Sequence, residues 1–254
     1  MLALERRKKI EEIIYRNRTV QVAELAAHFE VSMETIRSDL EKLEEKGLIV
    51  RTYGGAALAD TAEPELGVDM RDIENYEGKQ KIGKAAADLI RDGETIFLDA
   101  STSSLHLARS IKTKRSLIVI TNSVRVVEEL AMCDHITTIC VGGRLSSRNL
   151  SFVGRVSETL IREHYAADKM FFSCRGLTVA LGLMDNTESE AEIKKAMMER
   201  AEEIIFLCDN QKPDRRGMQV ICGFDRLSRA VVEDGLPDEF YQAFSDAGVE
   251  VIRA

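Results

Sequence analysis

The sequence predicts an α/β domain with a mostly parallel sheet, preceded by a small winged helix-turn-helix domain. Three observations support this fold class. Residues 22–40 have the apolar spacing of two short helices separated by a turn. A glycine pair then separates two short runs of strand character. Beyond residue 79, apolar runs alternate with helical patterns, which is typical of parallel sheets covered by helices.

Length and composition agree with two folded domains. The chain has 254 residues, of which 44% are hydrophobic and 31% charged, as in globular proteins. Apolar runs stay below the roughly 18 residues of a membrane span, and the N-terminus lacks the order of a signal peptide. We therefore expect a cytoplasmic protein with no membrane partner.

The five cysteines lie mostly in apolar runs, which indicates reduced core residues; they are Cys133, Cys140, Cys174, Cys208 and Cys222. Cys133 lies two positions from His135, but a single such pair is a poor zinc signature. The sequence therefore predicts neither a metal nor a cofactor.

The N-terminal helices follow from apolar spacing. An opening helix runs to about Arg16, with Ile10, Ile13 and Ile14 on one side. The first helix of the pair buries Val22, Leu25, Ala26 and Phe29. Ser32 opens the second helix, which buries Ile36, Leu40 and Leu43 and ends near Gly47, a typical C′ residue.

The second of these helices has a polar outer face. With Ile36 and Leu40 inward, a turn of 100° per residue places Glu34, Arg37, Ser38 and Glu41 outward. Early residues of such a helix contact base edges in helix-turn-helix complexes. We therefore predict DNA binding through Ser32, Met33, Glu34, Thr35, Arg37 and Ser38.

A glycine hairpin follows the helix pair. Residues 48–51 and 56–58 are predicted strands on either side of Gly54 and Gly55, which permit a tight reversal. This segment is a candidate wing in which Arg51, Tyr53 and Gly54 face DNA. An ordinary hairpin that stabilises the small domain needs the same residues, so that alternative stays open.

The charge distribution decides whether an acidic chain is compatible with DNA. The net charge is −8, yet residues 1–58 contain ten Lys/Arg and ten Asp/Glu. The excess acid therefore belongs to the second domain. A basic face toward phosphates is available from Arg6, Arg7, Lys8, Lys9, Arg16, Arg18, Arg37 and Arg51. A solvated charge run is the alternative for residues 6–9.

Composition places the domain boundaries. Residues 1–58 form the predicted DNA-binding domain, and residues 59–78 are acidic, lack periodicity and contain Pro64 and Gly67, which indicates a linker. The second domain covers residues 79–254. Its predicted helix at 81–91 precedes strands at 95–98, 117–121, 136–141, 169–173, 204–208 and 230–233.

In such a sheet, ligands bind at the carboxyl ends of the strands. The first strand ends in Asp99, and Ser101, Thr102 and Ser103 then open a helix, whose free amides and hydroxyls suit an anion such as phosphate. The later strands end in Thr121, Asn122 and Ser123, in Gly142, Gly143 and Arg144, in Ser173, Cys174, Arg175 and Gly176, and in Asp209, Asn210, Gln211 and Lys212.

Each of these segments also has a purely structural explanation. For Thr121, Asn122 and Ser123 alone, helix capping is favoured. Glu190 lies near a helix start, where Glu is common in any case. Lys212 directly follows a strand, where it can pair with a ligand phosphate or hydroxyl, or can simply be solvated.

With these residues identified, the chain resembles the DeoR family of bacterial transcriptional regulators over nearly its full length. The first half of the match is residues 31–40 with Gly47 and residues 51–56; the second is residues 99–102, residues 121–123, Gly142 and Gly143, Glu190 and Ala191 with Lys194, and Asp209 with Lys212. The chain departs from the family at Ser38, Tyr53 and Ala100, where arginine, histidine and glycine are common.

The resemblance implies a repressor with a sensor domain similar to sugar-phosphate isomerases, and with phosphorylated sugars as effectors. It implies effector contacts at Asp99, Ser101, Thr102, Ser103, Thr121, Asn122, Gly142, Gly143, Glu190 and Lys212. Because one short recognition helix reads few base pairs, we expect a homodimer or homotetramer on double-stranded operator DNA.

Two other function classes were weighed against this one. In a sugar-phosphate isomerase, Asp99 or Glu190 would abstract a proton next to a carbonyl, while Lys212 stabilised the enediolate. An isomerase gains nothing from a recognition helix, so we expect no enzyme activity. A DNA-binding architectural protein with a passive second domain is the third possibility, and the convergent polar groups argue against it.

Overall fold

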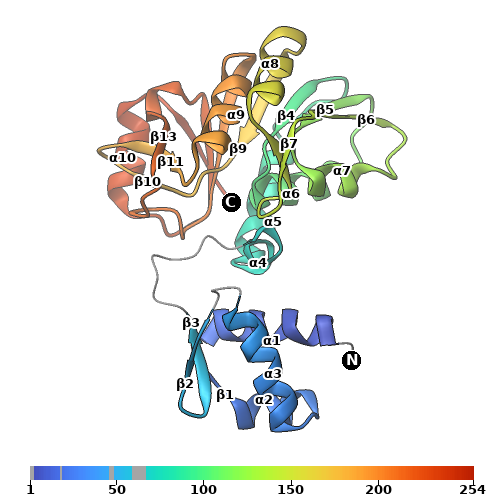
Figure 1. Ribbon diagram of the computed structural model, residues 1–254. Coiled ribbons are helices and arrows are strands. Elements are labelled where there is room, and N and C mark those ends of the chain that lie inside the picture. Colours follow the sequence, from blue (N-terminus) through green and yellow to red (C-terminus); the bar gives the residue numbers. More distant parts are fainter. Residues whose placement is uncertain (1–2, 18, 46–48, 59–66) are drawn as a thin grey trace. The chain divides into compact units, whose positions relative to one another are not determined.

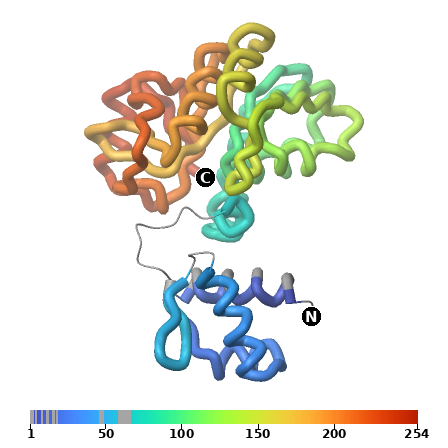
Figure 2. The backbone as a smooth tube through the Cα atoms, in the orientation of Figure 1, coloured from blue at the N-terminus to red at the C-terminus, as the bar shows by residue number. Residues whose placement is uncertain are grey.

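The computed structural model describes residues 3–17, 19–45, 49–58 and 67–254, and the chain divides into two units, Met1–Glu65 and Leu66–Ala254. The described part of the first unit contains three helices, α1 (Ala3–Asn17), α2 (Val22–Phe29) and α3 (Met33–Glu44). Figure 2 shows their path. The predicted pair of helices is confirmed, while Gly47, the expected C′ residue, lies outside the described residues.

The apolar faces of these helices form one core. Of the residues predicted to point inward, Ile13 is partly buried and packs against this core, and the others are buried, namely Ile10, Ile14, Val22, Leu25, Ala26, Phe29, Ile36, Leu40 and Leu43. Full burial of an Ile or Leu contributes about 1.5–3 kcal/mol. The helix-turn-helix thus packs against α1, which leaves the outer face of α3 in solvent.

A short strand was not predicted. The strand β1 (Thr19–Gln21) immediately precedes α2 and pairs antiparallel with β3 (Gly55–Leu58). The strand β2 (Ile49–Thr52) pairs with the other edge of β3. The hairpin is therefore part of a three-stranded sheet in the order β1-β3-β2.

Part of the predicted linker is structured. Residues 67–78 contain α4 (Val68–Ile73) and the start of α5 (Tyr76–Ala87), so the second unit begins before Lys79. Gly67 precedes α4 as its N-cap, and the amide of Val68 donates to the carbonyl of Arg148 at 2.9 Å. The expectation of an aperiodic linker up to residue 78 is wrong because two turns of helix are too short to show a clear period.

The second unit is built on a seven-stranded parallel sheet in the order β15-β14-β12-β9-β4-β5-β6. Its strands are β4 (Thr95–Leu98), β5 (Leu117–Thr121), β6 (Ile136–Cys140), β9 (Ala167–Phe172), β12 (Ala201–Cys208), β14 (Arg229–Val232) and β15 (Glu250–Arg253). Chain order reverses direction between β4 and β9. This is the topological switch point, where open α/β sheets bind ligands.

Helices cover both faces of this sheet (Figure 1). One face packs on α5, α6 (Thr102–Ser110) and α7 (Val124–Leu130), through residues such as Ile82, Leu107 and Val126. The other packs on α8 (Arg155–His164), α9 (Glu188–Met198) and α10 (Asp238–Asp246). Along β4, Ile96 and Leu98 face one core and Phe97 the other, as the period of two requires.

Two small antiparallel sheets and one 3-10 turn complete the described part of the unit. The hairpin of β7 (Arg144–Ser146) and β8 (Ser151–Val153) lies between β6 and α8 in the chain. A second sheet contains β10 (Gly176–Thr178), β11 (Gly182–Asp185) and β13 (Gln219–Cys222), followed by η1 (Phe224–Arg226). Both sheets bring residues to the candidate site described below.

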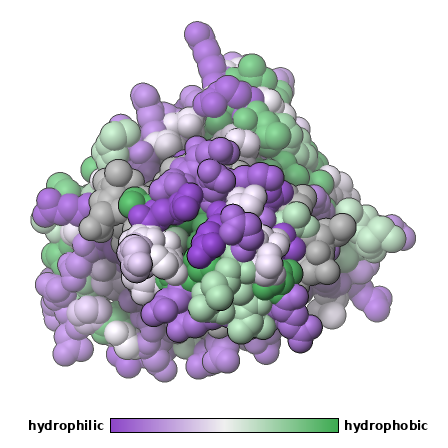
Figure 3. All heavy atoms as spheres, turned by 60° about the horizontal axis from the view of Figure 1, so that its bottom comes forward, coloured by the Kyte–Doolittle hydropathy of each residue, from purple (hydrophilic) through white to green (hydrophobic). Residues whose placement is uncertain are grey.

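The surface is mixed. On the face drawn in Figure 3, hydrophilic residues predominate and hydrophobic residues lie in smaller patches between them. Among the described residues, no helix combines the length and the apolar character needed to cross a membrane.

Candidate functional site

The exposed face of α3 carries the residues predicted to contact DNA. Ser32 is the N-cap of α3, and its Oγ accepts a hydrogen bond from the amide of Thr35 at 3.2 Å. The two hydroxyls of Ser32 and Thr35 are 2.8 Å apart. Four side chains lie exposed on this face, namely Met33, Glu34, Arg37 and Ser38.

Arg37 is an exposed basic side chain of α3 that pairs with Glu34, one helical turn earlier. Its Nη1 lies 3.0 Å from Glu34 Oε2, and both side chains are more than half exposed. An ion pair in such an exposed position contributes little to stability. The guanidinium can therefore leave Glu34 at little cost and bond a guanine edge or a phosphate instead.

The wing residues Arg51 and Tyr53 are exposed, as predicted. Gly54 adopts φ +82°, a left-handed conformation that glycine tolerates best, and its carbonyl accepts from the amide of Val22 at 2.9 Å. This hydrogen bond joins the hairpin tip to the first residue of α2. The wing is thus fixed relative to the helix-turn-helix.

The basic run at the N-terminus does not act as one surface. Arg6 is 8% exposed, and its Nε donates to Asp39 Oδ2 on α3 at 2.6 Å. This buried ion pair ties α1 to the recognition helix. The prediction that Arg6 faces phosphates is therefore wrong, because its charge is used inside the domain.

In the second unit, Asp99 organises the loops at the switch point. Its Oδ1 accepts from the Oγ atoms of Ser101 and Ser104, both at 2.6 Å, and from the amide of Ser101 at 3.2 Å. Its Oδ2 accepts from the amide of Ser173, at the end of β9, at 3.3 Å. The carboxylate is 1% exposed and joins the ends of the two central strands.

The start of α6 follows this carboxylate. Ser101 caps the helix, its Oγ accepting from the amide of Ser104 at 3.1 Å, as the sequence predicts for a helix start. Thr102 and Ser103 are buried. Within the described part of the chain, Ser103 Oγ and Asn122 Oδ1 are buried polar atoms without a hydrogen-bond partner. Such atoms are rare in folded proteins and favour a ligand at this place.

Lys194 is a buried cation that the predicted effector set omitted. Its Nζ bonds Asp185 Oδ2 and lies 3.5 Å from Asp99 Oδ2. Burial by itself lowers the pKa of Lys194, but the carboxylates of Asp185, Asp99 and Glu190 outweigh this effect and raise the pKa above its ordinary value. Lys194 is therefore positively charged at neutral pH.

Glu190 lies one helical turn before Lys194 on α9, and both are buried. Its Oε1 accepts from Asn149 Nδ2 at 2.8 Å and from Ser151 Oγ at 2.6 Å. Asn149 and Ser151 belong to the β7–β8 hairpin, which the sequence did not predict. The spacing of four between Glu190 and Lys194 was the available signal, because it places both on one face of a helix.

Lys212 is neither free nor fully solvated. Its Nζ lies 3.3 Å from Asp209 Oδ2, and its side chain is 18% exposed. Although burial raises the pKa of Asp209, the charges of Lys212 and Lys79 lower it below its usual value. Burial and the charge of Lys212 lower the pKa of Lys79 to about 8. Two ammonium groups and one carboxylate thus share the end of β12.

Other predicted residues have structural roles in this conformation. Thr121 Oγ1 accepts from the amide of Ser123 at 3.0 Å, and Ser123 caps α7, in line with the capping explanation. The carbonyl of Gly142 accepts from Ser157 Oγ at 2.6 Å, and a Cβ on Gly143 would meet the same Oγ at 2.0 Å. These glycines follow β6, the edge strand, two positions from β4.

Among the residues described, no three His, Cys, Asp or Glu side chains are grouped to hold a metal. His135 Nε2 instead donates to the carbonyl of Lys112 at 2.6 Å. The chemistry of the switch point is that of hydrogen bonding and charge: three carboxylates (Asp99, Asp185 and Glu190), the ammonium of Lys194 and several hydroxyls. Such a set suits a polyhydroxylated ligand with an anionic group.

Both parts of the chain match known families. A family model described as a DeoR-like helix-turn-helix domain matches residues 6–62, and one described as a DeoR C terminal sensor domain matches residues 74–234. The chain belongs to the DeoR family of transcriptional regulators. The resemblance seen in the sequence is thereby confirmed, and this DeoR regulator is a DNA-binding protein with a sensor domain.

Relatives of this DeoR regulator cover it almost completely. The uncharacterized HTH-type transcriptional regulator YulB of Bacillus subtilis is 37% identical over 99% of this chain and 96% of its own length. A putative aga operon transcriptional repressor of Escherichia coli O157:H7 is 32% identical over 98% of this chain and 93% of its own. These relatives are named as regulators of transcription.

Among solved structures, D-ribose-5-phosphate isomerase in complex with phospho-erythronic acid aligns with 54% of this chain and 54% of its own, at 15% identity and a TM-score of 0.41.

The predicted fold class, a helix-turn-helix domain followed by an α/β domain with a parallel sheet, is confirmed by the strand order and by both family matches.

Proposed function

We propose that this DeoR regulator represses a carbohydrate-metabolism operon and that a phosphorylated sugar, bound at the carboxyl edge of the sensor sheet, controls its affinity for DNA. The observation that carries the proposal is the buried charge cluster at the switch point, where Lys194 pairs with Asp99 and Asp185 and lies one helical turn from the buried Glu190. The relative named as an aga operon repressor supports the operon class.

The phosphate has a suitable place at the start of α6. The amides and hydroxyls of Ser101, Thr102 and Ser103 open this helix, whose positive dipole end favours an anion. Ser103 Oγ, buried without a partner in the described structure, supplies a free donor. Lys194 pairs with Asp99 and Asp185, and Lys212 pairs with Asp209, so the two ammonium groups balance much of the neighbouring carboxylate charge.

The hydroxyls of the sugar then face the acceptors. Asn122 Oδ1 has no partner among the described residues, and Glu190 holds only neutral donors on Oε1. Asp99 and Lys212 complete the set, and Thr121, Gly142 and Gly143 shape the neighbouring loops. A polar ligand is favoured over an apolar one because Ser103 Oγ and Asn122 Oδ1 are buried without a partner among the described residues.

The isomerase alternative is disfavoured by how the groups are held. Of the two carboxylates considered as bases, Asp99 accepts hydrogen bonds from the backbone and from two hydroxyls, and Glu190 accepts from Asn149 and Ser151, so both are already engaged in structural hydrogen bonds. We infer that the site binds without turnover. Measurable isomerisation of ribose 5-phosphate by the purified chain would contradict this.

The direct test combines effector binding with DNA binding. Ribose 5-phosphate, glucose 6-phosphate, glycerol 3-phosphate and their unphosphorylated forms are screened for thermal stabilisation of the full chain. A sugar phosphate that stabilises the chain should change its affinity for a DNA fragment selected from a random pool by 5- to 150-fold. Equal effects of the phosphorylated and unphosphorylated forms would overturn the phosphate assignment.

Two variants locate the site. Lys212→Ala and Thr102→Ala should abolish the response to the sugar phosphate, while DNA binding without effector stays at the wild-type level, because neither residue belongs to the DNA-binding unit. Lys195→Ala is the matched control. Lys195 is the next residue after Lys194 but pairs with Glu192 on the surface of α9, so its loss should leave the response intact.

Because operator DNA is the target, we also propose a cytoplasmic location and double-stranded DNA as the macromolecular partner.

A further inference from the structure

The helix α4 is the first element of the second unit. The first unit ends at Glu65 and α4 begins at Val68, so the chain enters the sensor unit through this helix. Its six residues bury little apolar surface, since Val68 is the buried hydrophobic residue of the helix. What holds α4 in place is a set of polar contacts, and these divide into two groups.

The first group leads into the proposed effector site. Arg71 Nη2 donates to Asn149 Oδ1 at 2.8 Å, and Asn149 Nδ2 donates to Glu190 Oε1 at 2.8 Å. The side chain of Asn149 is 6% exposed and bridges α4 and α9 through its two amide atoms. The orientation of this one amide therefore links a site carboxylate to α4.

A second link joins α4 to the end of β12. Lys79 Nζ donates to the carbonyls of Arg71 and Glu74, which close the C-terminal end of α4. The same ammonium lies in the field of Lys212 and Asp209. Asn75, between the two helices, donates to Glu233 Oε2 at 2.6 Å, and that oxygen also accepts from the amide of Asn210.

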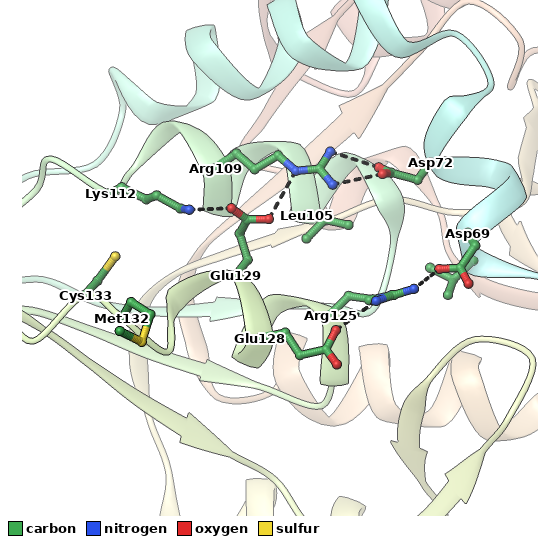
Figure 4. Close-up of a pocket in the computed structure, with 11 residues that line it drawn as sticks. Asp69, Asp72, Leu105, Arg109, Lys112, Arg125, Glu128, Glu129, Met132 and Cys133 are labelled. Carbon is green, nitrogen blue, oxygen red and sulfur yellow. Dashed lines mark hydrogen bonds and ion pairs between the residues drawn. The ribbon is translucent and has the colours of Figure 1, made fainter. Parts of the chain in front are cut away.

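The other group of contacts joins α4 to α6 and α7 and does not involve the proposed effector site (Figure 4). Asp72 accepts from Arg109 on α6 at 2.9 Å and lies 3.2 Å from His106 Nε2, and Asp69 is bonded by Arg125 on α7. Asp69, Asp72, Arg109 and Arg125 line a cleft of about 460 Å³ that includes none of the proposed effector ligands. This group anchors α4 to the body of the domain without a connection to the charge cluster.

We propose that α4 is the coupling helix of the sensor domain, and that effector binding is transmitted to it through the Arg71–Asn149–Glu190 relay. The inference rests on the function proposed above. A sugar hydroxyl that donates to Glu190 competes with Asn149 Nδ2 for the same carboxylate oxygen. Because leaving a buried amide unpaired is costly, Asn149 then rotates or shifts, and Arg71 loses its hydrogen bond to Asn149 Oδ1, one of the contacts that hold α4.

A ligand changes an equilibrium only through its different affinity for the two states. In one state Asn149 bonds Glu190 and α4 is anchored; in the other the ligand bonds Glu190 and α4 is released. The ligand therefore favours the released state. The relay therefore predicts that effector binding loosens α4. It also predicts that a chain without the relay still binds the effector, but that this binding no longer changes the affinity for DNA.

The test is the variant Arg71→Ala in the full chain, with Arg125→Ala as the matched control. Both substitutions remove an arginine contact of α4. Arg71 bonds Asn149, which in turn bonds Glu190, whereas Arg125 bonds Asp69 and Glu128. The probe is whichever of the named sugar phosphates stabilises the wild-type chain. Thermal shift reports binding, and titration against the selected DNA fragment reports coupling.

We expect Arg71→Ala to bind the sugar phosphate at least as tightly as wild type, because the competing anchored state is lost, while its effect on DNA affinity falls from at least 5-fold to below twofold. Arg125→Ala should keep the wild-type response. Amide exchange in residues 67–75 should accelerate when the sugar phosphate binds the wild-type chain. A full response in Arg71→Ala, or unchanged exchange in α4, would overturn the inference while leaving the proposed function standing. A wild-type chain that binds none of the sugar phosphates overturns both.

Discussion

At the scale of single residues, the two units use charge in opposite ways. Arg37 and Glu34 form an exposed pair on α3, where solvent screens the attraction and either group can leave for another partner. Lys194, Asp99 and Asp185 form a buried cluster, where the ammonium stabilises both carboxylates and its loss would be costly. The first arrangement suits a partner that comes and goes over a surface, and the second suits a pre-formed pocket.

The first residue-scale prediction concerns Arg37. If its guanidinium contacts a guanine edge, Arg37→Ala should weaken binding to the selected DNA by about 1–3 kcal/mol and relax the base preference at one position. Salt-matched titrations with the selected fragment and its single-base variants measure both effects. Lys42→Ala is the control, because Lys42 is exposed in the last turn of the same helix and should change affinity without changing preference.

A second residue-scale prediction concerns Lys79 and pH. Its pKa in the folded protein is about 8, below the ordinary 10.5, because of burial and the charge of Lys212. Between these two values the unfolded chain binds more protons, so the free energy of unfolding rises with pH. Relative to Lys79→Met, the wild-type chain should gain up to about 1.4 kcal/mol per pH unit above pH 8. Urea unfolding from pH 7 to 10 measures this, and parallel pH profiles would disprove it.

At the scale of elements, the three-stranded sheet explains how a short hairpin becomes a rigid wing. The strand β3 is paired on both edges, by β1 and by β2, and the carbonyl of Gly54 accepts from the first amide of α2. An isolated two-stranded hairpin is marginally stable in water, whereas a third strand with a buried face supports it. The wing is thus held by the strand that precedes the helix-turn-helix.

Gly55 and Gly54 provide the test of this arrangement. A Cβ on Gly55 would lie 2.0 Å from the carbonyl oxygen of Val20 in β1, a backbone atom that cannot rotate away, whereas a Cβ on Gly54 would meet no atom within 4 Å. Gly55→Ala should therefore separate β1 from β3. Gly54→Ala should cost only about 1–2 kcal/mol from its left-handed backbone.

Amide exchange of residues 19–21 and 55–57 distinguishes the two variants. We expect fast exchange in β1 and weakened DNA binding for Gly55→Ala, with slow exchange retained in Gly54→Ala. Equal protection of β1 in the two variants would mean that the close approach at Gly55 does not matter for the wing.

At the scale of the whole molecule, the number of recognition helices limits affinity. One chain offers a single α3 of 12 residues, which reads few base pairs. We predict a homodimer or a higher even oligomer held together by the sensor domains, so that two recognition helices bind paired half-sites. Light scattering at micromolar concentration gives the mass, and DNA with one or two half-sites gives the gain in affinity. A monomer that binds a single half-site undiminished would contradict the prediction.

The sequence alone determined the elements whose patterns are local. The repeat of Ile36, Leu40 and Leu43, with Ser32 as cap, predicted α3 and its outer face, and the apolar runs at 95–98 and 117–121 coincide with β4 and β5. Polar residues at strand ends placed Asp99, Asn122 and Lys212 at one edge of the sheet. These signals work because helix and strand periods, caps and strand ends depend on residues a few positions apart.

The tertiary structure decided what depends on residues far apart in the chain. The strand β1 exists because Val20 pairs with Ala56, and a three-residue run has no period of its own. Asn149 reaches Glu190 from 41 positions away, and Arg71 reaches Asn149 from 78 positions away. Arg6 is withdrawn from the surface by Asp39 on another helix. Nothing in the local sequence encodes these partners, because they are chosen by the packing of whole elements and by the need of each buried polar group for a partner.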